Sequence, residues 1–341
     1  MKNHIYDYFS KWKLNSFGNN MFNFPDGKPA WKFPSYGFFH LFWVLLAIIS
    51  IILLVKFLKK PTIKQTKLVF LVAWIILLVF EILKQIFTAG HNFQSYREKW
   101  FLHPTSLCAT LLLFYPIYLL IPGKLKKTSN VFLGYTSTIS LWTGLFVMVY
   151  PADVFAPELF ISFHTMIYHG TLLVVGAWAL IRRIFNITWQ NSWKHLLWIF
   201  LVLFVVITLA VIGNEIIYQY NIKHKNNMYL GNFFNFSHRY KTPFGYSTPW
   251  LWKINPFSFI TIYIITTFFG VGLFYYLFIG LGYLIETIEN YLTILKNKKI
   301  NQNENTLENI IENNEQKNLN NKLIKSTRKM RFSKEKRFKN K

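Results

Sequence analysis

The chain alternates long apolar blocks with short polar segments, and this alternation is its dominant pattern. A run of about 20 apolar residues is long enough to cross the hydrocarbon core of a bilayer as an α-helix. Seven blocks fit this description, and they cover residues 36–58, 68–89, 100–121, 130–150, 159–181, 196–217 and 257–285. We therefore predict an all-α polytopic membrane protein whose domain, residues 36–285, is a bundle of about seven transmembrane helices.

Three polar segments flank or interrupt this bundle. Residues 1–35 are polar but dotted with aromatic side chains, which suits an extracytoplasmic interfacial segment, and the first apolar block is too long for a cleavable signal. Residues 218–256 form a long outer loop. Residues 286–341 are rich in Asn, Lys and Glu and end in a basic run, which predicts a largely disordered cytoplasmic tail. The alternative role of this tail is contact with anionic lipid.

Composition and charge agree with a membrane location. Of the 341 residues, 52% are hydrophobic and 19% are aromatic, more than soluble folds usually carry. A net charge of +24 would suit nucleic acid if it gathered on one soluble domain, but the basic residues stand between the apolar blocks and in the tail. We expect membrane lipids as partners and no nucleic acid.

The basic residues also predict the orientation. They gather in the short loops after the first, third and fifth blocks, whereas the loop after the fourth block carries Asp153 and Glu158 and no basic residue. Short loops rich in Lys and Arg stay in the cytoplasm. We therefore expect a multi-pass protein of the plasma membrane with its N-terminus outside and its C-terminus in the cytoplasm.

Polar groups of several spans fall at a common depth. Counting a rise of about 1.5 Å per residue from the outer ends places five of them in the outer half of the bilayer: Glu81, Lys84, Cys108, His164 and His169. Ionisable residues inside a membrane are candidates for function by default. We predict a polar cavity here, with Lys84, His103, Asn214 and Glu215 as candidate substrate-binding groups.

Each candidate also has a purely structural interpretation. Glu81 and Lys84 are three residues apart on one helical face, so they form either an internal ion pair or part of a site. His164 and His169 lie about 140° apart around a helix, so each either bonds to a neighbouring helix or acts alone as a base. The sequence shows no spacing typical of a zinc site, and we expect no metal and no cofactor.

The single cysteine, Cys108, is the candidate nucleophile inside the third span. His103, five residues earlier, lies on a different helical face, so an activating base must come from another helix. His164 or His169 has the right depth, and Glu81 is a candidate for orienting that base. The alternative is that Cys108 is an inert apolar packing residue.

The outer loop carries one more candidate, Trp250. It lies among aromatic residues interleaved with Pro and Gly turns. This pattern favours an aromatic belt that anchors the seventh helix at the interface, and its alternative is a lid that contacts substrate.

Several short motifs of the chain recur together in one known family. They are Pro104, Ser106 and Cys108, the pair His164 and His169, the loop residues 226–230, and the order Gly245, Pro249, Trp250. Over roughly residues 70–285 they resemble the bacterial YwaF family of integral membrane proteins, which is grouped with eukaryotic transmembrane protein 164. The resemblance implies a seven-helix bundle. For the eukaryotic relatives it implies acyl transfer between phospholipids through a membrane cysteine and histidine.

Two positions depart from the family pattern. The family has a histidine two residues before the cysteine, where this chain has Ser106. In the eukaryotic relatives the reactive cysteine directly follows the proline, a place that Thr105 occupies here. Thr105 and Ser106 therefore stand beside Cys108 as candidate nucleophiles.

These observations give a leading hypothesis and two alternatives. The leading hypothesis is a membrane-embedded acyltransferase or lipid hydrolase with His164 or His169 as general base and Cys108, Thr105 or Ser106 as nucleophile. The first alternative is a non-catalytic transport or binding protein that uses the intramembrane Glu, Lys and His groups. No repeat of broken helices typical of common carriers supports it. The second alternative is a membrane scaffold.

Overall fold

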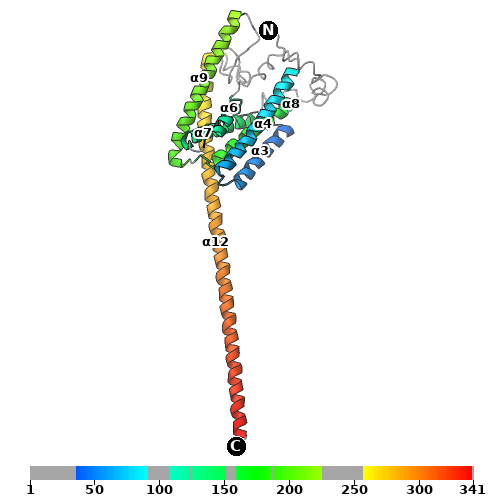
Figure 1. Ribbon diagram of the computed structural model, residues 1–341, viewed down its shortest axis with the longest axis vertical. Coiled ribbons are helices and arrows are strands. Elements are labelled where there is room, and N and C mark those ends of the chain that lie inside the picture. The colour runs from blue at the N-terminus through cyan, green and yellow to red at the C-terminus, as the bar shows by residue number, and fades with distance from the viewer. Residues whose placement is uncertain are drawn as a thin grey trace, which may run out of the picture. The chain divides into compact units, whose positions relative to one another are not determined.

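The computed structural model describes residues 36–90, 107–122, 125–150, 159–185, 187–224 and 256–339, and within these ranges it contains helices and no strand (Figure 1). In chain order the elements are α3 (Phe38–Phe57), α4 (Ile63–Gly90), α6 (Leu111–Leu120), α7 (Lys126–Val149), α8 (Leu159–Ile181), the 3₁₀ helix η1 (Trp189–Asn191), α9 (Ser192–His224) and α12 (Pro256–Lys339). The predicted N-terminal segment 1–35 and most of the outer loop 218–256 lie outside the described residues.

The prediction of an all-α membrane bundle is confirmed. Six of the described helices are long and apolar enough to cross a membrane: α3, α4, α7, α8, α9 and the first part of α12. The seventh apolar helix, α6, has 10 residues. Large apolar side chains point outward on α3, α4 and α9, as expected for helices that face hydrocarbon.

The third predicted span differs from the sequence-based expectation at Cys108. Our prediction that Cys108 lies inside the helix is wrong, because α6 begins at Leu111 and Cys108 belongs to the turn before it. The amide of Leu111 donates to the Cys108 carbonyl (3.3 Å), a three-residue turn bond. The hydroxyl of Thr110 donates to the Leu107 carbonyl (2.6 Å) and closes the same turn. Local side-chain bonds of this kind compete with helix formation.

Side-chain hydrogen bonds to helix ends show that the first spans alternate in direction. At one end of the bundle, Arg182 Nε at the end of α8 donates to the Val55 carbonyl of α3 (2.8 Å). Lys67 Nζ near the start of α4 donates to the carbonyls of Leu119 and Ile121 at the end of α6 (2.8 and 2.9 Å). These cations satisfy carbonyl groups that a helix end leaves without partners.

The opposite end of the bundle joins the start of α3 to the end of α7. The Tyr36 hydroxyl donates to the Val149 carbonyl (2.9 Å), and His40 Nε2 lies 3.0 Å from the Met148 carbonyl oxygen. The ends of α3, α6 and α8 therefore form one layer with the start of α4, and the start of α3 lies with the end of α7 in the other.

The centre of the bundle is the contact between α7 and α8, the most extensive helix contact among the described elements. Two glycines let these backbones approach closely. A Cβ on Gly144 would meet the Leu173 backbone and the His169 carbonyl oxygen (2.7 Å), and a Cβ on Gly176 would meet the Ser137 carbonyl oxygen (2.6 Å). Small residues at helix crossings serve the same purpose in other membrane proteins.

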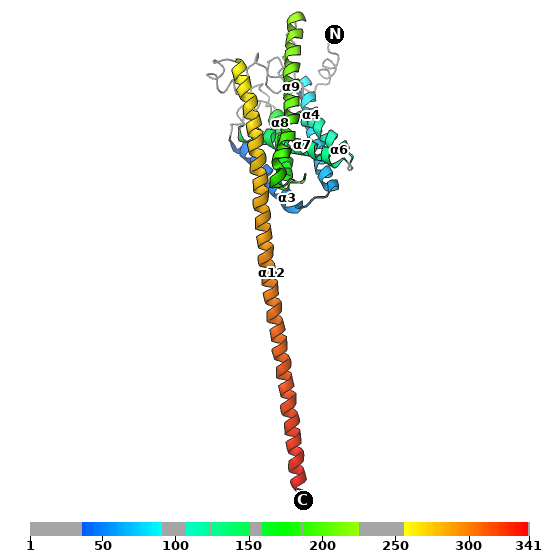
Figure 2. The same cartoon turned by 90° about the vertical axis from the view of Figure 1, so that its left-hand side faces the viewer.

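Helices α3 and α4 pack against α8, and α6 packs against both α4 and α7 (Figures 1 and 2). The indole Nε1 of Trp74 on α4 donates to the Leu112 carbonyl of α6 (3.0 Å). The Tyr275 hydroxyl of α12 donates to the Ser192 carbonyl at the start of α9 (2.9 Å). These contacts tie α4 to α6 and α12 to the start of α9.

The chain forms two units, Met1–Gly282 and Tyr283–Lys341, and α12 contributes to both. The composition of 286–341 predicts a largely disordered tail, whereas α12 is helical as far as Lys339. The segment after Gly282 contains neither Gly nor Pro. Nothing in it therefore breaks a helix once the transmembrane part has nucleated one.

Candidate functional site

A buried ion pair on α4 is the starting point of the site. Lys84 Nζ lies 2.8 Å from both carboxylate oxygens of Glu81, and Gln85 Nε2 donates to Glu81 Oε1 (2.7 Å). The spacings of three and four residues place all three side chains on one helical face. Glu81 and Lys84 are 7% and 8% exposed. The predicted ion pair is therefore present, and it is withdrawn from solvent.

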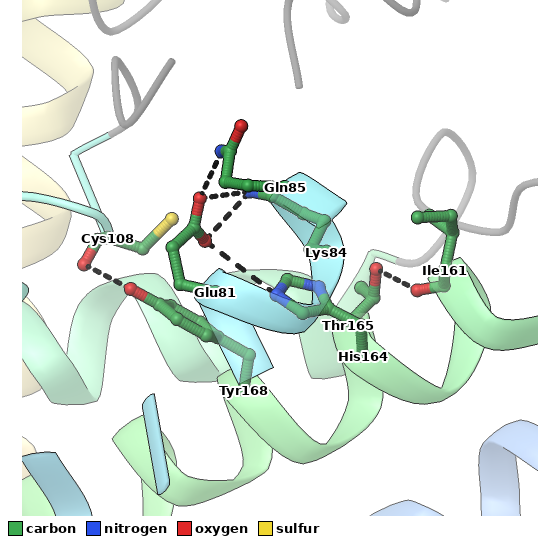
Figure 3. Close-up of polar contacts among 8 residues, drawn as sticks. All are labelled: Glu81, Lys84, Gln85, Cys108, Ile161, His164, Thr165 and Tyr168. Carbon is green, nitrogen blue, oxygen red and sulfur yellow. Dashed lines mark hydrogen bonds and ion pairs between the residues drawn. The ribbon is translucent and has the colours of Figure 1, made fainter. Parts of the chain in front are cut away.

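The second component comes from α8. His164 Nε2 lies 3.8 Å from Glu81 Oε2, too long for a hydrogen bond but within ion-pair distance (Figure 3). His164 is 7% exposed, and its Nε2 has no hydrogen-bond partner among the described residues. A buried imidazole nitrogen directed at a carboxylate is the arrangement in which the carboxylate orients a base.

The third component is the turn before α6. The hydroxyl of Tyr168, one helical turn after His164 on α8, donates to the Cys108 carbonyl (3.4 Å). The rings of His164 and Tyr168 stack with their centres 5.3 Å apart. Figure 3 shows Cys108, Glu81, His164 and Tyr168 gathered where α4, α8 and the turn meet. We call Glu81, Lys84, Gln85, His164 and Tyr168, together with Cys108, the outer cluster.

The outer cluster lies far from the layer that contains Lys67 and Arg182. At a rise of about 1.5 Å per residue, Glu81 lies roughly 21 Å along α4 from Lys67, and His164 lies roughly 27 Å along α8 from Arg182. The hydrocarbon core is about 30 Å thick. By this count Glu81 and His164 lie in the half of the bundle away from these cations.

His169, the other candidate base, takes a separate place. Its ring interacts with the backbone of Thr143 on α7, and its Nδ1 is buried without a hydrogen-bond partner among the described residues. The two histidines point in different directions because five residues turn a helix by about 140° beyond a full turn. Of the two, His164 is the one that meets the Glu81 carboxylate.

The remaining candidate residues divide into two groups. Asn214 is buried on α9, and Glu215 accepts a hydrogen bond from Gln219 of the same helix (2.7 Å). Helix α9 packs against α7, whereas the outer cluster lies between α4, α8 and the turn before α6. The other four candidates lie outside the described residues: His103, Thr105, Ser106 and Trp250.

Sequence reasoning missed two tyrosines that make buried contacts. One is Tyr168, which links the cluster to the Cys108 turn. The other is Tyr115 on α6, whose hydroxyl lies 2.7 Å from Ser140 Oγ on α7. A tyrosine inside an apolar block is a usable signal, because its hydroxyl must find a partner in hydrocarbon. The partner itself depends on tertiary packing.

Side chains that could bind a metal ion do not gather in the described part of the chain. Within the ranges that the structure describes, no group of three or more His, Cys, Asp or Glu side chains comes together in a way that would hold an ion. The charge already present in the cluster is matched, since Lys84 balances the Glu81 carboxylate. The chemistry that the cluster offers is therefore that of an imidazole, a carboxylate, a phenol and a thiol.

Comparison with models of known protein families gives a match. The model of the TMEM164 family matches residues 35–271, which includes the described parts of α3 to α9 and the start of α12. No curated protein matches the chain, and no solved structure does. The matched range covers more than half of the 341 residues and contains the whole outer cluster. The chain is a multi-pass membrane protein that belongs to the TMEM164 family.

Proposed function

We propose that the chain is a membrane-embedded enzyme that transfers or hydrolyses an acyl group of a membrane lipid. The observation that carries the proposal is the 3.8 Å approach of His164 Nε2 to Glu81 Oε2 inside a buried cluster that also contains Cys108. Acyl transfer needs a base, a group that orients it and a nucleophile. The outer cluster offers all three from three separate segments.

His164 is the general base in this proposal. Glu81 holds the imidazole at Nε2, and Lys84 and Gln85 hold the Glu81 carboxylate in place through their own bonds. In this proposal the imidazole accepts the proton of the nucleophile. The imidazolium that forms is stabilised by the same carboxylate.

The nucleophile comes from the segment just before α6. Cys108 is the described member, and Thr105 and Ser106 are the alternatives from the sequence. The deprotonated sulfur or oxygen attacks the ester carbonyl carbon, and His164 returns the proton to the departing alcohol of the lysolipid. The acyl group is then released when the hydroxyl of an acceptor lipid or of water attacks the acyl-enzyme.

The test uses purified protein in vesicles that contain two phospholipids with distinguishable deuterated acyl chains. Wild type is expected to redistribute or release the chains, as measured by lipid mass spectrometry. His164→Gln is expected to reduce this rate by about 10² or more, the usual contribution of a general base. His169→Gln is the matched control histidine and keeps most of the rate. Lipids left unchanged by wild type would remove catalysis from consideration, and equal redistribution by wild type and His164→Gln would remove His164 as the base.

A second series identifies the nucleophile. Cys108→Ala, Thr105→Ala and Ser106→Ala are compared in the same vesicles. The variant that loses chain transfer marks the attacking atom. Hydrolysis that survives all three changes would assign the attack to water, activated by His164, and chain transfer that survives them would assign it directly to the hydroxyl of the acceptor lipid.

A transport or binding role is the second candidate, and the ion pair favours it. A buried Glu–Lys pair shared by a histidine of a neighbouring helix is the kind of group that carries protons or binds a solute inside a membrane. The same vesicles loaded with a pH-sensitive dye separate the two ideas. Proton flux that depends on Glu81 without any change in lipid chains supports transport.

We further propose the orientation and the partners that the charges favour. The basic residues of the short loops favour a cytoplasmic position for the layer of Lys67 and Arg182, with the outer cluster on the extracytoplasmic side of the plasma membrane. The basic segment 325–341 then lies on the cytoplasmic side, where it is attracted to anionic lipid.

A further inference from the structure

The described helices also form a groove. It has a volume of about 440 Å³ and lies between α3, α4 and α8, which run side by side in Figure 1. Its walls include Trp43 and Leu54 on α3, Val72 and Ala73 on α4, and Thr171 on α8. This volume falls within the range of small-molecule sites, about 300–1,000 Å³.

The groove is apolar along its whole length. Only Ser50, Thr171 and the indole of Trp43 bring polar atoms to its lining, and no charged residue lines it. The Ser50 hydroxyl is already used, because it donates to the Leu46 carbonyl of its own helix (2.8 Å). A polar ligand would lose its hydration here without gaining matched partners. The lining therefore suits a hydrocarbon chain.

The surroundings of the groove favour a chain from the membrane. All three helices that form it are long and apolar enough to span a bilayer, and Val72, which lines it, is exposed. From Trp43 to Leu54 the groove extends roughly 16 Å along α3. The chains of one leaflet span roughly half of the 30 Å hydrocarbon core, or about 15 Å.

The floor of the groove continues to the outer cluster on two helices. On α4, Ala73 lines the groove, and Glu81 lies eight residues later on the same face. On α8, Thr171 lines the groove, and His164 lies seven residues earlier on the same face. The end of the groove nearest Trp43 is therefore also the end nearest the Glu81–His164 contact.

We propose that this groove holds one acyl chain of the lipid on which the site acts, with the carbonyl end of the chain directed toward Glu81 and His164. The proposal rests on the proposed function, since it names the part of the substrate that is recognised. It makes the chain, rather than the headgroup, the element that positions the ester. Chains too short to reach from Leu54 to the cluster lose this alignment.

The test fills the groove from its open side. Val72→Trp and Ser50→Trp place an indole in the groove, and both positions are at least partly exposed, so the core is left undisturbed. Leu71→Trp and Leu53→Trp are the matched controls, because these exposed neighbours on the same helices do not line it. Each protein is placed in vesicles of phosphatidylcholine that carries a photoreactive diazirine at mid-chain.

Peptide mapping after irradiation is the first measurement. The expected result is labelling of α3, α4 and α8 at groove residues, with most of it lost in Val72→Trp and Ser50→Trp and retained in the two controls. Labelling spread evenly over the exposed faces of α3 and α9 would overturn the proposal. Crosslinks between two copies of the chain at the groove would also overturn it, since a second copy would then be the occupant.

Chain transfer in the same proteins separates this inference from the proposed function. Groove filling is expected to lower the rate by about tenfold or more, as misalignment of a reacting group does, and to leave the controls near wild type. His164→Gln is expected to abolish transfer and to keep the groove labelled. Transfer that persists without groove labelling removes the inference alone. Groove labelling without any transfer in wild type removes the proposed function and, with it, the role of the chain as substrate.

Discussion

The imidazole Nε2 of His164 on α8 lies 3.8 Å from the carboxylate Oε2 of Glu81 on α4. The same carboxylate binds Lys84 and Gln85 of its own helix. The Glu81 carboxylate therefore takes part both in an ion pair within α4 and in the contact between α4 and α8.

Removal of only one partner of the Glu81–Lys84 ion pair is expected to destabilise the protein strongly. Lys84→Met leaves a buried carboxylate without its cation, and such changes destabilise proteins by about 3–5 kcal/mol. The double variant Glu81→Gln/Lys84→Met removes both charges and is expected to be more stable than Lys84→Met alone. Unfolding in mixed micelles at increasing SDS fraction measures the difference.

An exposed lysine provides the control for this comparison. Lys56, in the last turn of α3, is exposed, and Lys56→Met is expected to change stability by less than about 0.5 kcal/mol. If the losses of unfolding free energy caused by Glu81→Gln and by Lys84→Met simply added up in the double variant, Glu81 and Lys84 would not depend on each other.

The contact between α7 and α8 is expected to tolerate no side chain at its two glycines. Gly144→Ala and Gly176→Ala push a Cβ into the backbone of the opposite helix, and overpacking of this kind costs typically about 1–3 kcal/mol. Gly280→Ala is the matched control on α12, because nothing lies within 4 Å of its Cβ position. It is expected to be neutral or to stabilise the helix by up to about 1 kcal/mol. Thermal unfolding in detergent measures the stability of the three variants. Equal stabilities would contradict the close approach of the α7 and α8 backbones.

Orientation in the membrane is testable with single cysteines. Cys108→Ser removes the only thiol, and new cysteines then replace Lys59, Lys126 or Tyr220, which are exposed near opposite ends of the bundle. In intact cells a membrane-impermeant maleimide is expected to label Tyr220→Cys and to reach Lys59→Cys and Lys126→Cys only after permeabilisation. The reverse labelling pattern would show the opposite orientation, with the outer cluster on the cytoplasmic side.

The basic end of the chain is expected to bind anionic lipid. Residues 325–341 carry nine Lys and Arg residues and one Glu, and each basic residue near an anionic surface contributes about 1 kcal/mol. A fluorophore at Ser333→Cys, on the Cys108→Ser background, should be quenched by headgroup quenchers in vesicles with phosphatidylserine. Quenching should fall in 1 M salt, where the Debye length is about 3 Å. Equal quenching in neutral vesicles would exclude an electrostatic contact.

Much of the fold was predictable from the order of apolar and polar residues. The block 159–181 coincides with α8, Leu159–Ile181, because a run of apolar residues in a membrane must satisfy its backbone bonds as a helix. The start of α6 was not predictable. Residues 107–110, expected inside the helix, form a turn that includes a hydrogen bond from the Thr110 hydroxyl, and the Cys108 carbonyl accepts a bond from Tyr168 of a distant segment.

The sequence by itself determined which residues are chemically able to form a site, and it determined their depth. Helical rise fixes depth, so Glu81, Lys84 and His164 had to fall in one half of the bundle. Only the tertiary structure decided that His164 rather than His169 meets Glu81 and that Tyr168 contacts Cys108. The physical reason is that rotation of α8 about its axis is set by contacts that no local pattern encodes, above all the close packing at Gly144 and Gly176 on α7 and α8.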